Sequence, residues 1–245
     1  MSGLLPNHDV TRTIHQMSES FGQAIDAKDP FTKNHSDEVA VVSHAVALAM
    51  GLPAMAADVI HIAGHLHDIG KIGVPDSVLN KNGPLSEWEW RMVRKHPATG
   101  RAILEPVWAM AHMGVPELVV CHHERFDGRG YPQGLSGRDI PLGARIIAVA
   151  DSLSAMLQHR PYRTALEFED ACEEIRCGAG TQFDPAVVDA FVTIREPVRQ
   201  MLIYSRHAAG PLDALLDGDD EEWTPPLKLN GGRALPPRGL EEERS

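Results

Sequence analysis

Apolar residues recur at intervals of three and four along most of this chain, the pattern of amphipathic helices. The first stripe lies between residues 11 and 27 and consists of Ile14, Met17, Phe21 and Ile25. A second helix is expected from residue 33 to 50, with these side chains pointing inward: Val39, Val42, Val46 and Leu48. A third helix is expected from near Ala56 into a glycine-rich turn after His67.

Capping signals and apolar runs predict further helices downstream. Ser86 and Glu89 are spaced as a capping box, so a helix should begin at Ser86 and end near His96. Shorter helices are expected over residues 100–112 and 115–123, followed by an apolar helix over 144–157.

Two later signals predict helix starts near the end of the folded region. Thr164 and Glu167 have capping-box spacing, and Asp184-Pro185 places an N-cap residue before a first-turn proline. No stretch alternates convincingly with period two, so the predicted fold class is all-α. We expect an N-terminal helix over residues 1–28, a main domain over 29–204 and an acidic, Pro/Gly-rich disordered tail over 205–245.

Composition narrows the possible functions. The net charge of −11 argues against a duplex nucleic acid partner, which requires a basic surface. No apolar run approaches the roughly 18 residues of a membrane span, and the N-terminus does not resemble a signal peptide. Three cysteines are too few for a disulfide framework, so a cytoplasmic location is expected.

Candidate chemistry begins with His67 and Asp68, at the end of an apolar run and directly before Gly70, Lys71 and Gly73. An imidazole and a carboxylate in a turn of this kind can ligate one divalent metal ion or bridge two. Further candidate ligands occur elsewhere in the chain: His35, His96, His122, His123 and Asp151.

These seven residues are expected to hold two ions, with Asp68 as the bridge. Consecutive helical residues diverge by about 100°, so His122 and His123 should each offer one nitrogen to a different ion. Nitrogen-rich ligand sets suit iron, manganese or zinc better than magnesium or calcium. His44, His61 and His65 are expected to be core histidines, and His61 or His65 could also orient a ligand.

The motif series resembles the HD-GYP family of cyclic di-GMP phosphodiesterases, a branch of the HD metal-dependent phosphohydrolases. The resemblance extends from about Asp29 to Phe191 and rests on the order and spacing of many motifs. The motifs are Asp29-Pro30-Phe31-Thr32 before His35, His67-Asp68 with Lys71, His96-Pro97 with Gly100, His122-His123, Gly130-Tyr131-Pro132, Asp151, Arg160-Pro161-Tyr162-Arg163 and Phe183-Asp184-Pro185.

The resemblance implies an HD-like helical bundle with an extended GYP loop, and a metal site built from the seven residues above. It implies two divalent transition-metal ions, with iron or manganese foremost and zinc, nickel or cobalt as alternatives. Asp68 and Lys71 would serve catalysis, with Lys71 touching the phosphate or the attacking water. The implied substrate contacts are Lys71, Tyr131, Arg160 and Arg163, together with Asp29, which could also protonate the leaving oxygen.

Two departures from the family pattern affect these expectations. Some members have a glutamate four residues before the first ligand and bind a third metal, whereas Phe31 occupies that position here, so two ions are expected. The family often has an aspartate three residues after Asp151, where this chain has Ser154, which leaves the support of a neighbouring ligand in doubt.

The first functional hypothesis is hydrolysis of cyclic di-GMP to linear pGpG by a hydroxide activated by two metals, with GMP as a further possible product. A second is hydrolysis of another nucleotide, such as a hybrid cyclic dinucleotide. A third is an inactive sensor or partner-binding module. The expected partners are a cyclic dinucleotide and either a protein, for example a diguanylate cyclase, or a second copy of this chain.

Overall fold

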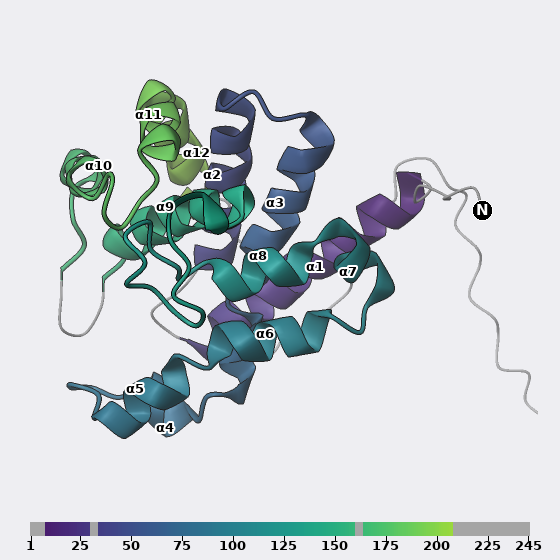
Figure 1. The fold of residues 1–245 in the computed structure, drawn as a ribbon, viewed down its shortest axis with the longest axis vertical. Coiled ribbons are helices and arrows are strands. Elements are labelled where there is room, and N and C mark those ends of the chain that lie inside the picture. Colours follow the sequence, from purple (N-terminus) through teal and green to yellow (C-terminus); the bar gives the residue numbers. More distant parts are fainter. Residues whose placement is uncertain (1–7, 30–33, 160–163, 208–245) are drawn as a thin grey trace, which may run out of the picture. The chain divides into compact units, whose positions relative to one another are not determined.

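A computed structural model describes residues 8–29, 34–159 and 164–207, and this part of the chain is built from helices without a strand (Figure 1). Its longer helices are α1 (His8–Lys28), α2 (His35–Ala49), α3 (Ala54–Leu66), α9 (Leu142–Met156) and α12 (Arg195–His207). The shorter helices are α4 (Asp76–Leu79), α5 (Glu87–Val93), α6 (His96–Leu104), α7 (Trp108–Met113), α8 (Val115–Cys121), α10 (Phe168–Cys177) and α11 (Pro185–Thr193), with 3-10 turns η1 (Ile69–Gly73) and η2 (Gly137–Asp139). The all-α prediction is confirmed.

The core forms where α2 packs against α3 and α9. Val39, Val42 and Val46 of α2 are fully buried, as predicted. The prediction for Leu48 is wrong, because its side chain is 46% exposed. Leu48 follows Val46 by two residues, which is about 200° around the helix, so it faces away from the buried side.

The buried face of α1 differs from the predicted apolar stripe. Ile25 is buried, but Met17 and Phe21 are about half exposed, so the expectation that they belong to a buried face is wrong. The buried Ser18 hydroxyl instead donates to the Ile14 carbonyl oxygen within α1. A Cβ added to Gly22 would lie 2.8 Å from the His65 carbonyl oxygen, so a glycine permits the close contact between α1 and α3.

Helix boundaries follow the local capping chemistry only in part. The Ser86–Glu89 capping box is confirmed at the start of α5. The predicted helix over 100–112 is wrong, since residues 105–107 separate α6 from α7 around Pro106, which cannot donate a helical hydrogen bond. The Asp184 cap is confirmed, because its carboxylate accepts a hydrogen bond from the Ala186 amide.

The second predicted capping box, at Thr164, is wrong. Residues 164–167 are not helical, and α10 begins at Phe168. Neither α4 nor α12 was predicted, although Val198 and Leu202 of α12 are buried and the helix packs on α2.

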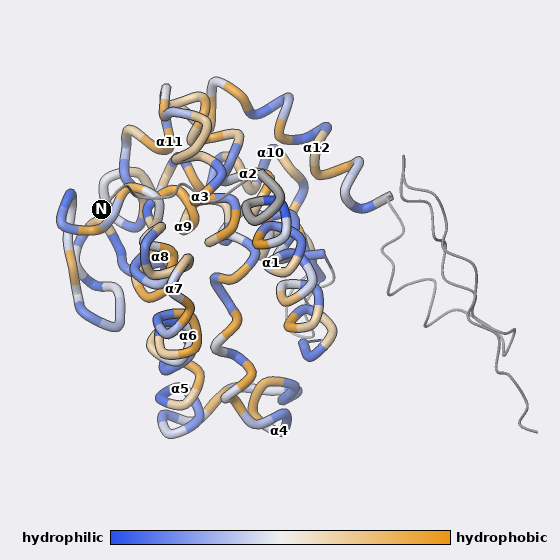
Figure 2. The backbone as a smooth tube through the Cα atoms, turned by 90° about the vertical axis from the view of Figure 1, so that its right-hand side faces the viewer, coloured by the Kyte–Doolittle hydropathy of each residue, from blue (hydrophilic) through white to orange (hydrophobic). Residues whose placement is uncertain are grey.

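Figure 2 shows hydrophobic and hydrophilic stretches alternating along the helices, as expected for a bundle with one core. No helix among the described residues has the length and apolar character needed to cross a bilayer. The predicted tail beyond residue 207 lies outside the described residues, and so do Phe31, Arg160 and Arg163.

Candidate metal centre

The turn between α3 and η1 places His67 and Asp68 directly against the start of α6. A Cβ on Gly70 would lie 1.9 Å from the His96 carbonyl oxygen and 2.6 Å from the Gly100 amide nitrogen. Only glycine therefore allows this contact, which brings His96 Nε2 to 3.2 Å from Asp68 Oδ1. Asp68 and His96, which are 28 positions apart in the sequence, thus come together because Gly70 has no side chain. From the sequence, this glycine was identified only as part of a turn after the helix.

Backbone carbonyls orient three of the imidazoles in the same way. In each ring the Nδ1–H group donates a hydrogen bond to the carbonyl oxygen of the residue three positions earlier. The pairs are His67 to Gly64 at 2.7 Å, His96 to Val93 at 2.8 Å and His122 to Val119 at 2.6 Å. In a neutral imidazole this leaves the lone pair on Nε2, and a second hydrogen bond of this kind commonly fixes metal-ligating histidines.

The inward-facing nitrogens fit a bound cation. His96 Nε2 and His122 Nε2 lie 3.3 Å apart, and with both Nδ1 atoms donating, two lone pairs face each other. His67 Nε2 is buried and makes no hydrogen bond of good geometry, although Asp68 Oδ2 lies 3.3 Å from it. Burying a polar atom without a partner costs free energy. A cation between these nitrogens would relieve the repulsion between the facing lone pairs and would give His67 Nε2 a partner.

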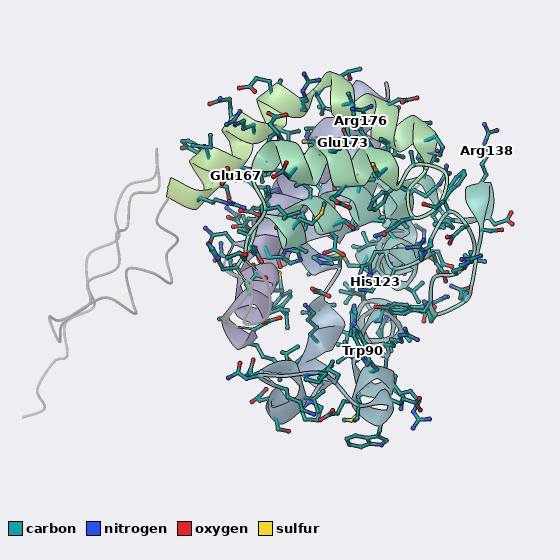
Figure 3. The ribbon with its side chains drawn as sticks, turned by 90° about the vertical axis from the view of Figure 1, so that its left-hand side faces the viewer. Trp90, His123, Arg138, Glu167, Glu173 and Arg176 are labelled. Carbon is teal, nitrogen blue, oxygen red and sulfur yellow. The ribbon has the colours of Figure 1, made fainter. Side chains whose placement is uncertain are left out.

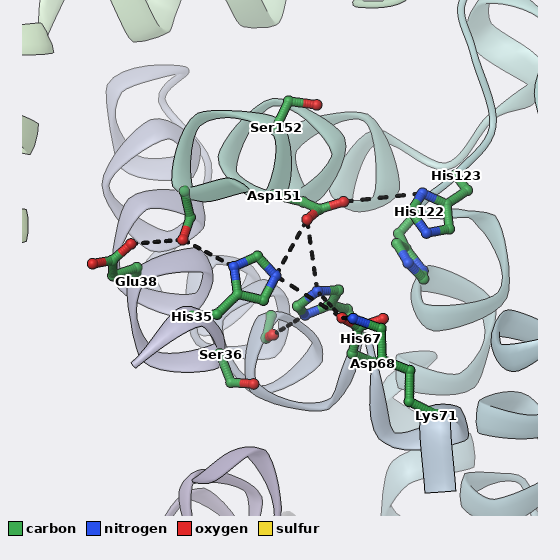
Figure 4. Close-up of polar contacts among 12 residues, drawn as sticks. His35, Ser36, Glu38, His67, Asp68, Lys71, His122, His123, Asp151 and Ser152 are labelled. Atoms are coloured by element: carbon green, nitrogen blue, oxygen red, sulfur yellow. Dashed lines mark hydrogen bonds and ion pairs between the residues drawn. The ribbon is translucent and has the colours of Figure 1, made fainter. Parts of the chain in front are cut away.

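All seven predicted ligands lie together, in two groups of potential donor atoms. Figure 4 labels all of them except His96. Within each group the donor atoms lie within 4.8 Å of one another. One group contains Asp68, His96, His122 and His123, and the other contains His35, His67 and Asp151.

Two carboxylates connect these groups. Asp68 Oδ1 faces His96, while its Oδ2 lies 3.3 Å from His67 Nε2 and 3.9 Å from His35 Nε2. Asp151 Oδ1 lies 3.3 Å from His35 Nε2, and its Oδ2 lies 3.9 Å from His123 Nδ1. Each carboxylate thus offers one oxygen to each group, the arrangement expected of bridging ligands.

His122 and His123 do not diverge as predicted. Their ring centroids are only 4.0 Å apart, and both belong to the same donor group. The prediction assumed helical geometry, whereas α8 ends at Cys121 and the two histidines lie in the following turn. Figure 3 shows Arg138 projecting from the edge of the domain, whereas His123, which is half-buried, lies away from that edge.

His35 is oriented by a chain of side chains rather than by a backbone carbonyl. Its Nδ1 lies 2.9 Å from Ser154 Oγ, and the Ser154 hydroxyl donates to Glu38 Oε2 at 2.6 Å. Arg206 of α12 donates to both Glu38 oxygens, at 2.7 and 3.3 Å. Ser154 therefore supplies the support that the sequence left in doubt, while Glu38 and Arg206 were missed because they lie far apart in the chain.

Lys71 places a positive charge beside the centre. Its Nζ lies 2.7 Å from Asp68 Oδ2 and 3.5 Å from Asp29 Oδ2. Burial alone would lower the pKa of Lys71, but the carboxylates of Asp68 and Asp29 outweigh it and raise the pKa above its usual value. Lys71 is consequently an ammonium ion that faces the bridging carboxylate.

The centre favours deprotonated ligands in most positions. Burial opposes ionisation of Asp68, but Lys71 and His67 hold its pKa well below the usual range. Burial and the neighbouring His96 lower the pKa of His123 to about 3, so its ring is neutral. His67 differs, because Asp68 outweighs the effect of burial and raises its pKa to about 9. Metal binding to His67 must therefore displace a proton at neutral pH.

The loop after His123 is held by hydrogen bonds to the carboxylate of Glu124, which was not identified from the sequence. Glu124 is buried and accepts hydrogen bonds from the backbone amides of Gln133, Gly134 and Leu135, at 2.7, 3.2 and 3.1 Å. A Cβ on Gly130 would lie 2.3 Å from the Arg125 amide nitrogen, so this position also requires glycine.

This loop holds Tyr131 beside His123 of the centre. The Tyr131 ring lies 4.8 Å from the His123 ring, and the Arg94 guanidinium lies 5.4 Å from the tyrosine ring centroid. Tyr131 is half-buried, so it both packs on the centre and retains an exposed surface.

Comparisons with known proteins agree with this geometry. A family model described as "HD domain" matches residues 19–187. A cyclic di-GMP phosphodiesterase of Thermotoga maritima is 36% identical over 185 residues, which cover 76% of this chain and 50% of that protein. The cyclic di-GMP phosphodiesterase response regulator RpfG of Xanthomonas campestris pv. campestris is 38% identical, over 79% of this chain and 51% of its own length.

Two further similarities concern a different cyclic dinucleotide. The 3′3′-cGAMP-specific phosphodiesterase 2 of Vibrio cholerae is 34% identical, over 76% of this chain and 37% of its own length. The crystal structure of a cyclic GMP-AMP-specific phosphodiesterase of V. cholerae superposes with a TM-score of 0.55 at 17% identity, over 79% of this chain and 49% of that one. The chain thus spans about half the length, or less, of these curated relatives.

Proposed function

Because this chain belongs to the HD domain family, we propose that it is a metal-dependent phosphodiesterase that hydrolyses cyclic di-GMP to linear pGpG. The observation that carries the proposal is the convergence of five imidazoles and two carboxylates in two connected donor groups. Relatives named as cyclic di-GMP phosphodiesterases, which match about three quarters of this chain, support the choice of substrate.

In this proposal the seven residues hold two divalent transition-metal ions. His35, His67 and Asp151 would hold one ion, and His96, His122 and His123 would hold the other, with Asp68 close to both groups. Iron or manganese fits this mixture of imidazole and carboxylate, and zinc, nickel or cobalt are alternatives. When bound, such ions lower the pKa of a coordinated water and neutralise negative charge on the phosphate.

Side chains of the protein would position the substrate, stabilise the developing negative charge and supply a proton to the leaving oxygen. A water attacks the phosphorus, the bond from phosphorus to the 3′ oxygen breaks, and that oxygen gains a proton. Lys71 lies beside Asp68 and would stabilise the charge that develops on the non-bridging oxygens. Asp29, which lies 3.5 Å from Lys71 Nζ, or a water would supply the proton to the leaving oxygen.

Residues around the entrance would select a cyclic dinucleotide. Tyr131 offers an aromatic face beside His123 on which a guanine can stack. Arg160 and Arg163, which lie outside the described residues, are proposed to bind the second phosphate through bidentate contacts. One cleavage opens the ring to pGpG, and a second cleavage would give GMP.

A second candidate substrate is 3′3′-cGAMP, because a relative at 34% identity bears that specificity in its name. The two substrates differ in one base only, so the choice depends on groups that contact the purine rather than on the metal centre. An inactive cyclic dinucleotide sensor is the remaining alternative.

The test is to load purified protein with manganese, or with iron under anaerobic conditions, and to follow cyclic di-GMP, 3′3′-cGAMP and cyclic di-AMP by chromatography. The proposal predicts pGpG from cyclic di-GMP, at a higher kcat/KM than for the other two. Faster hydrolysis of 3′3′-cGAMP would assign the second candidate. Tight binding of cyclic di-GMP without hydrolysis would identify a sensor.

Two further proposals concern context. A cytoplasmic location is supported by three cysteines that form no disulfide, since such thiols persist in reducing compartments. A protein partner, such as a diguanylate cyclase, or a second copy of the chain stays a prediction.

A further inference from the structure

A second histidine cluster lies outside the candidate metal centre, where α1 crosses α3. It consists of His15 from α1 and of His61 and His65 from α3. One potential donor atom from each residue lies within 4.8 Å of the other two. None of the three residues belongs to the seven-residue centre, so the cluster needs a separate explanation.

The backbone brings these rings together. His61 and His65 are four residues apart, so they lie on one face of α3. The glycine contact between Gly22 and the His65 carbonyl lets α1 approach that face closely. His15 then stacks on His61 at a centroid distance of 4.8 Å and meets His65 edge-on at 5.7 Å.

The placement of hydrogens on the ring nitrogens of the cluster leaves a lone pair available for a cation. His65 Nε2 and His61 Nε2 lie 3.1 Å apart, a distance at which only one of the two nitrogens can carry a hydrogen. His65 Nδ1 lies 3.2 Å from Asp37 Oδ1, although the two atoms do not meet hydrogen-bond geometry, and we place the hydrogen of the neutral His65 ring on Nδ1 because it then faces this carboxylate. The lone pair of His65 Nε2 is thereby directed at His61, as in a carboxylate–histidine–metal arrangement.

The cluster is also poor in positive charge. Burial and the neighbouring His65 lower the pKa of His61 to about 3, so that ring is neutral and does not compete for a cation with a proton. His65 is buried, whereas His15 and His61 are only partly buried, which leaves a side from which an ion could enter.

We propose that His15, His61 and His65 bind one divalent transition-metal ion of the zinc class, which fastens α1 to α3. Three imidazoles with a water in the fourth position form a common tetrahedral zinc site. The ion would support the candidate centre from a distance, because α1 also carries Asp26, whose carboxylate accepts hydrogen bonds from Ser36 beside His35. This inference stands independently of the proposed phosphodiesterase activity.

The experiment compares zinc content in the full-length wild type, His15→Gln and His44→Gln, each saturated with zinc and then gel-filtered. His44 is the matched control, since its ring lies 5.6 Å from His61 but its Nε2 pairs with Asp58. We expect His15→Gln to hold one zinc ion per chain fewer than the wild type, and His44→Gln to hold the same number. Equal zinc content in wild type and His15→Gln would overturn the proposal.

A second measurement needs no substitution and covers the case in which His15→Gln fails to fold. Wild-type protein, freed of metal by chelation, is treated with diethyl pyrocarbonate with and without zinc, and the modified histidines are mapped by mass spectrometry. The proposal predicts that zinc protects His15 and His61 but not His44. Equal modification of His15 with and without zinc contradicts it.

Discussion

The two histidine clusters of this domain differ in what surrounds their imidazoles. In the candidate centre, Asp68 raises the pKa of the buried His67 to about 9, against the effect of burial. At the crossing of α1 and α3, burial and a second imidazole lower the pKa of His61 to about 3. The same residue type is therefore charged in one place and neutral in the other when no metal is bound.

This difference has a structural origin. The centre contains two carboxylates that reach both donor groups, and its rings are anchored on backbone carbonyls. The second cluster has a single carboxylate, Asp37, which faces only the outer nitrogen of His65. Carboxylates between the rings allow two closely spaced ions, whereas imidazoles alone suit one ion.

The largest expected effect comes from removing the carboxylate that joins the two donor groups. Asp68→Asn keeps the shape of the side chain but loses the charge that attracts both ions. We expect kcat/KM for cyclic di-GMP to fall on the order of 10³-fold or more, together with metal content. Asp58→Asn, at an exposed carboxylate that pairs with His44, is the control and should retain both. If Asp68→Asn kept its full metal content, the carboxylate between the rings would not be what distinguishes the centre from the second histidine cluster.

The buried carboxylate of Asp26, for which burial outweighs the nearby charges, should behave in the opposite way to Asp68. Burial raises the pKa of Asp26 from 3.8 to about 6, although the charge of His35 and hydrogen bonds from Ser36 oppose this rise. The folded state then favours the protonated form, so the stability that this group contributes is present below about pH 4 and is lost as the pH rises through 6. The change corresponds to about 3 kcal/mol at most.

Urea unfolding of metal-free protein between pH 4 and 7 measures this contribution. The free energy of unfolding of the wild type should decrease over that range relative to Asp26→Asn, whose amide does not ionise. Asp170→Asn, at an exposed position of α10, provides the control and should follow the wild type. Parallel curves for the wild type and Asp26→Asn would show that Asp26 is ionised without cost.

The orientation of His35 by side chains gives the next prediction. Ser154→Ala removes the acceptor for His35 Nδ1–H, so the affinity of the ion bound by His35 should fall roughly 10- to 100-fold. Ser152→Ala, in the same helix but bonded to Gln182, should leave metal affinity unchanged. Titration with manganese followed by electron paramagnetic resonance measures the difference, and Ser154→Thr should restore affinity. A loss in both alanine variants would point to a general effect on α9.

The smallest effect is expected at the loop that holds Tyr131. Glu124→Gln replaces one acceptor oxygen by a donor that faces backbone amides, which should loosen the loop without touching the ligands. We expect KM for cyclic di-GMP to rise about 10-fold, consistent with a cost of 1–3 kcal/mol for a lost buried hydrogen bond. Metal content should not change. Initial-rate kinetics with metal analysis would separate the two effects, and a loss of metal would show that the loop supports the centre itself.

The sequence predicted the helical class, because that class depends on local patterns, while the role of the seven candidate ligands stays a prediction. Helical spacing revealed α2 and α3, and the resemblance to HD phosphohydrolases, confirmed at the level of the HD domain family, named the seven residues that the structure brings together. Leu48 and Phe21 were misjudged because spacing alone does not determine which side of a helix faces the core.

Other features could not be predicted because they depend on contacts between distant segments. Arg206 reaches Glu38 only because α12 packs on α2, and nothing near Arg206 in the sequence signals this. His61 and His65 of α3 were assigned to the core individually and His15 of α1 was not singled out, since their convergence requires the close approach at Gly22. The GYP motif marked Tyr131, but the buried Glu124 that organises its loop has no separate signal.

The central claim is that the seven imidazole and carboxylate residues form one centre for two adjacent ions. Anomalous diffraction at the metal absorption edge, on crystals grown from manganese- or iron-loaded protein, tests this claim directly. The account predicts two neighbouring peaks, both in contact with Asp68, one beside His35 and His67 and the other beside His96 and His122. A single peak, or peaks that do not touch Asp68, would contradict it.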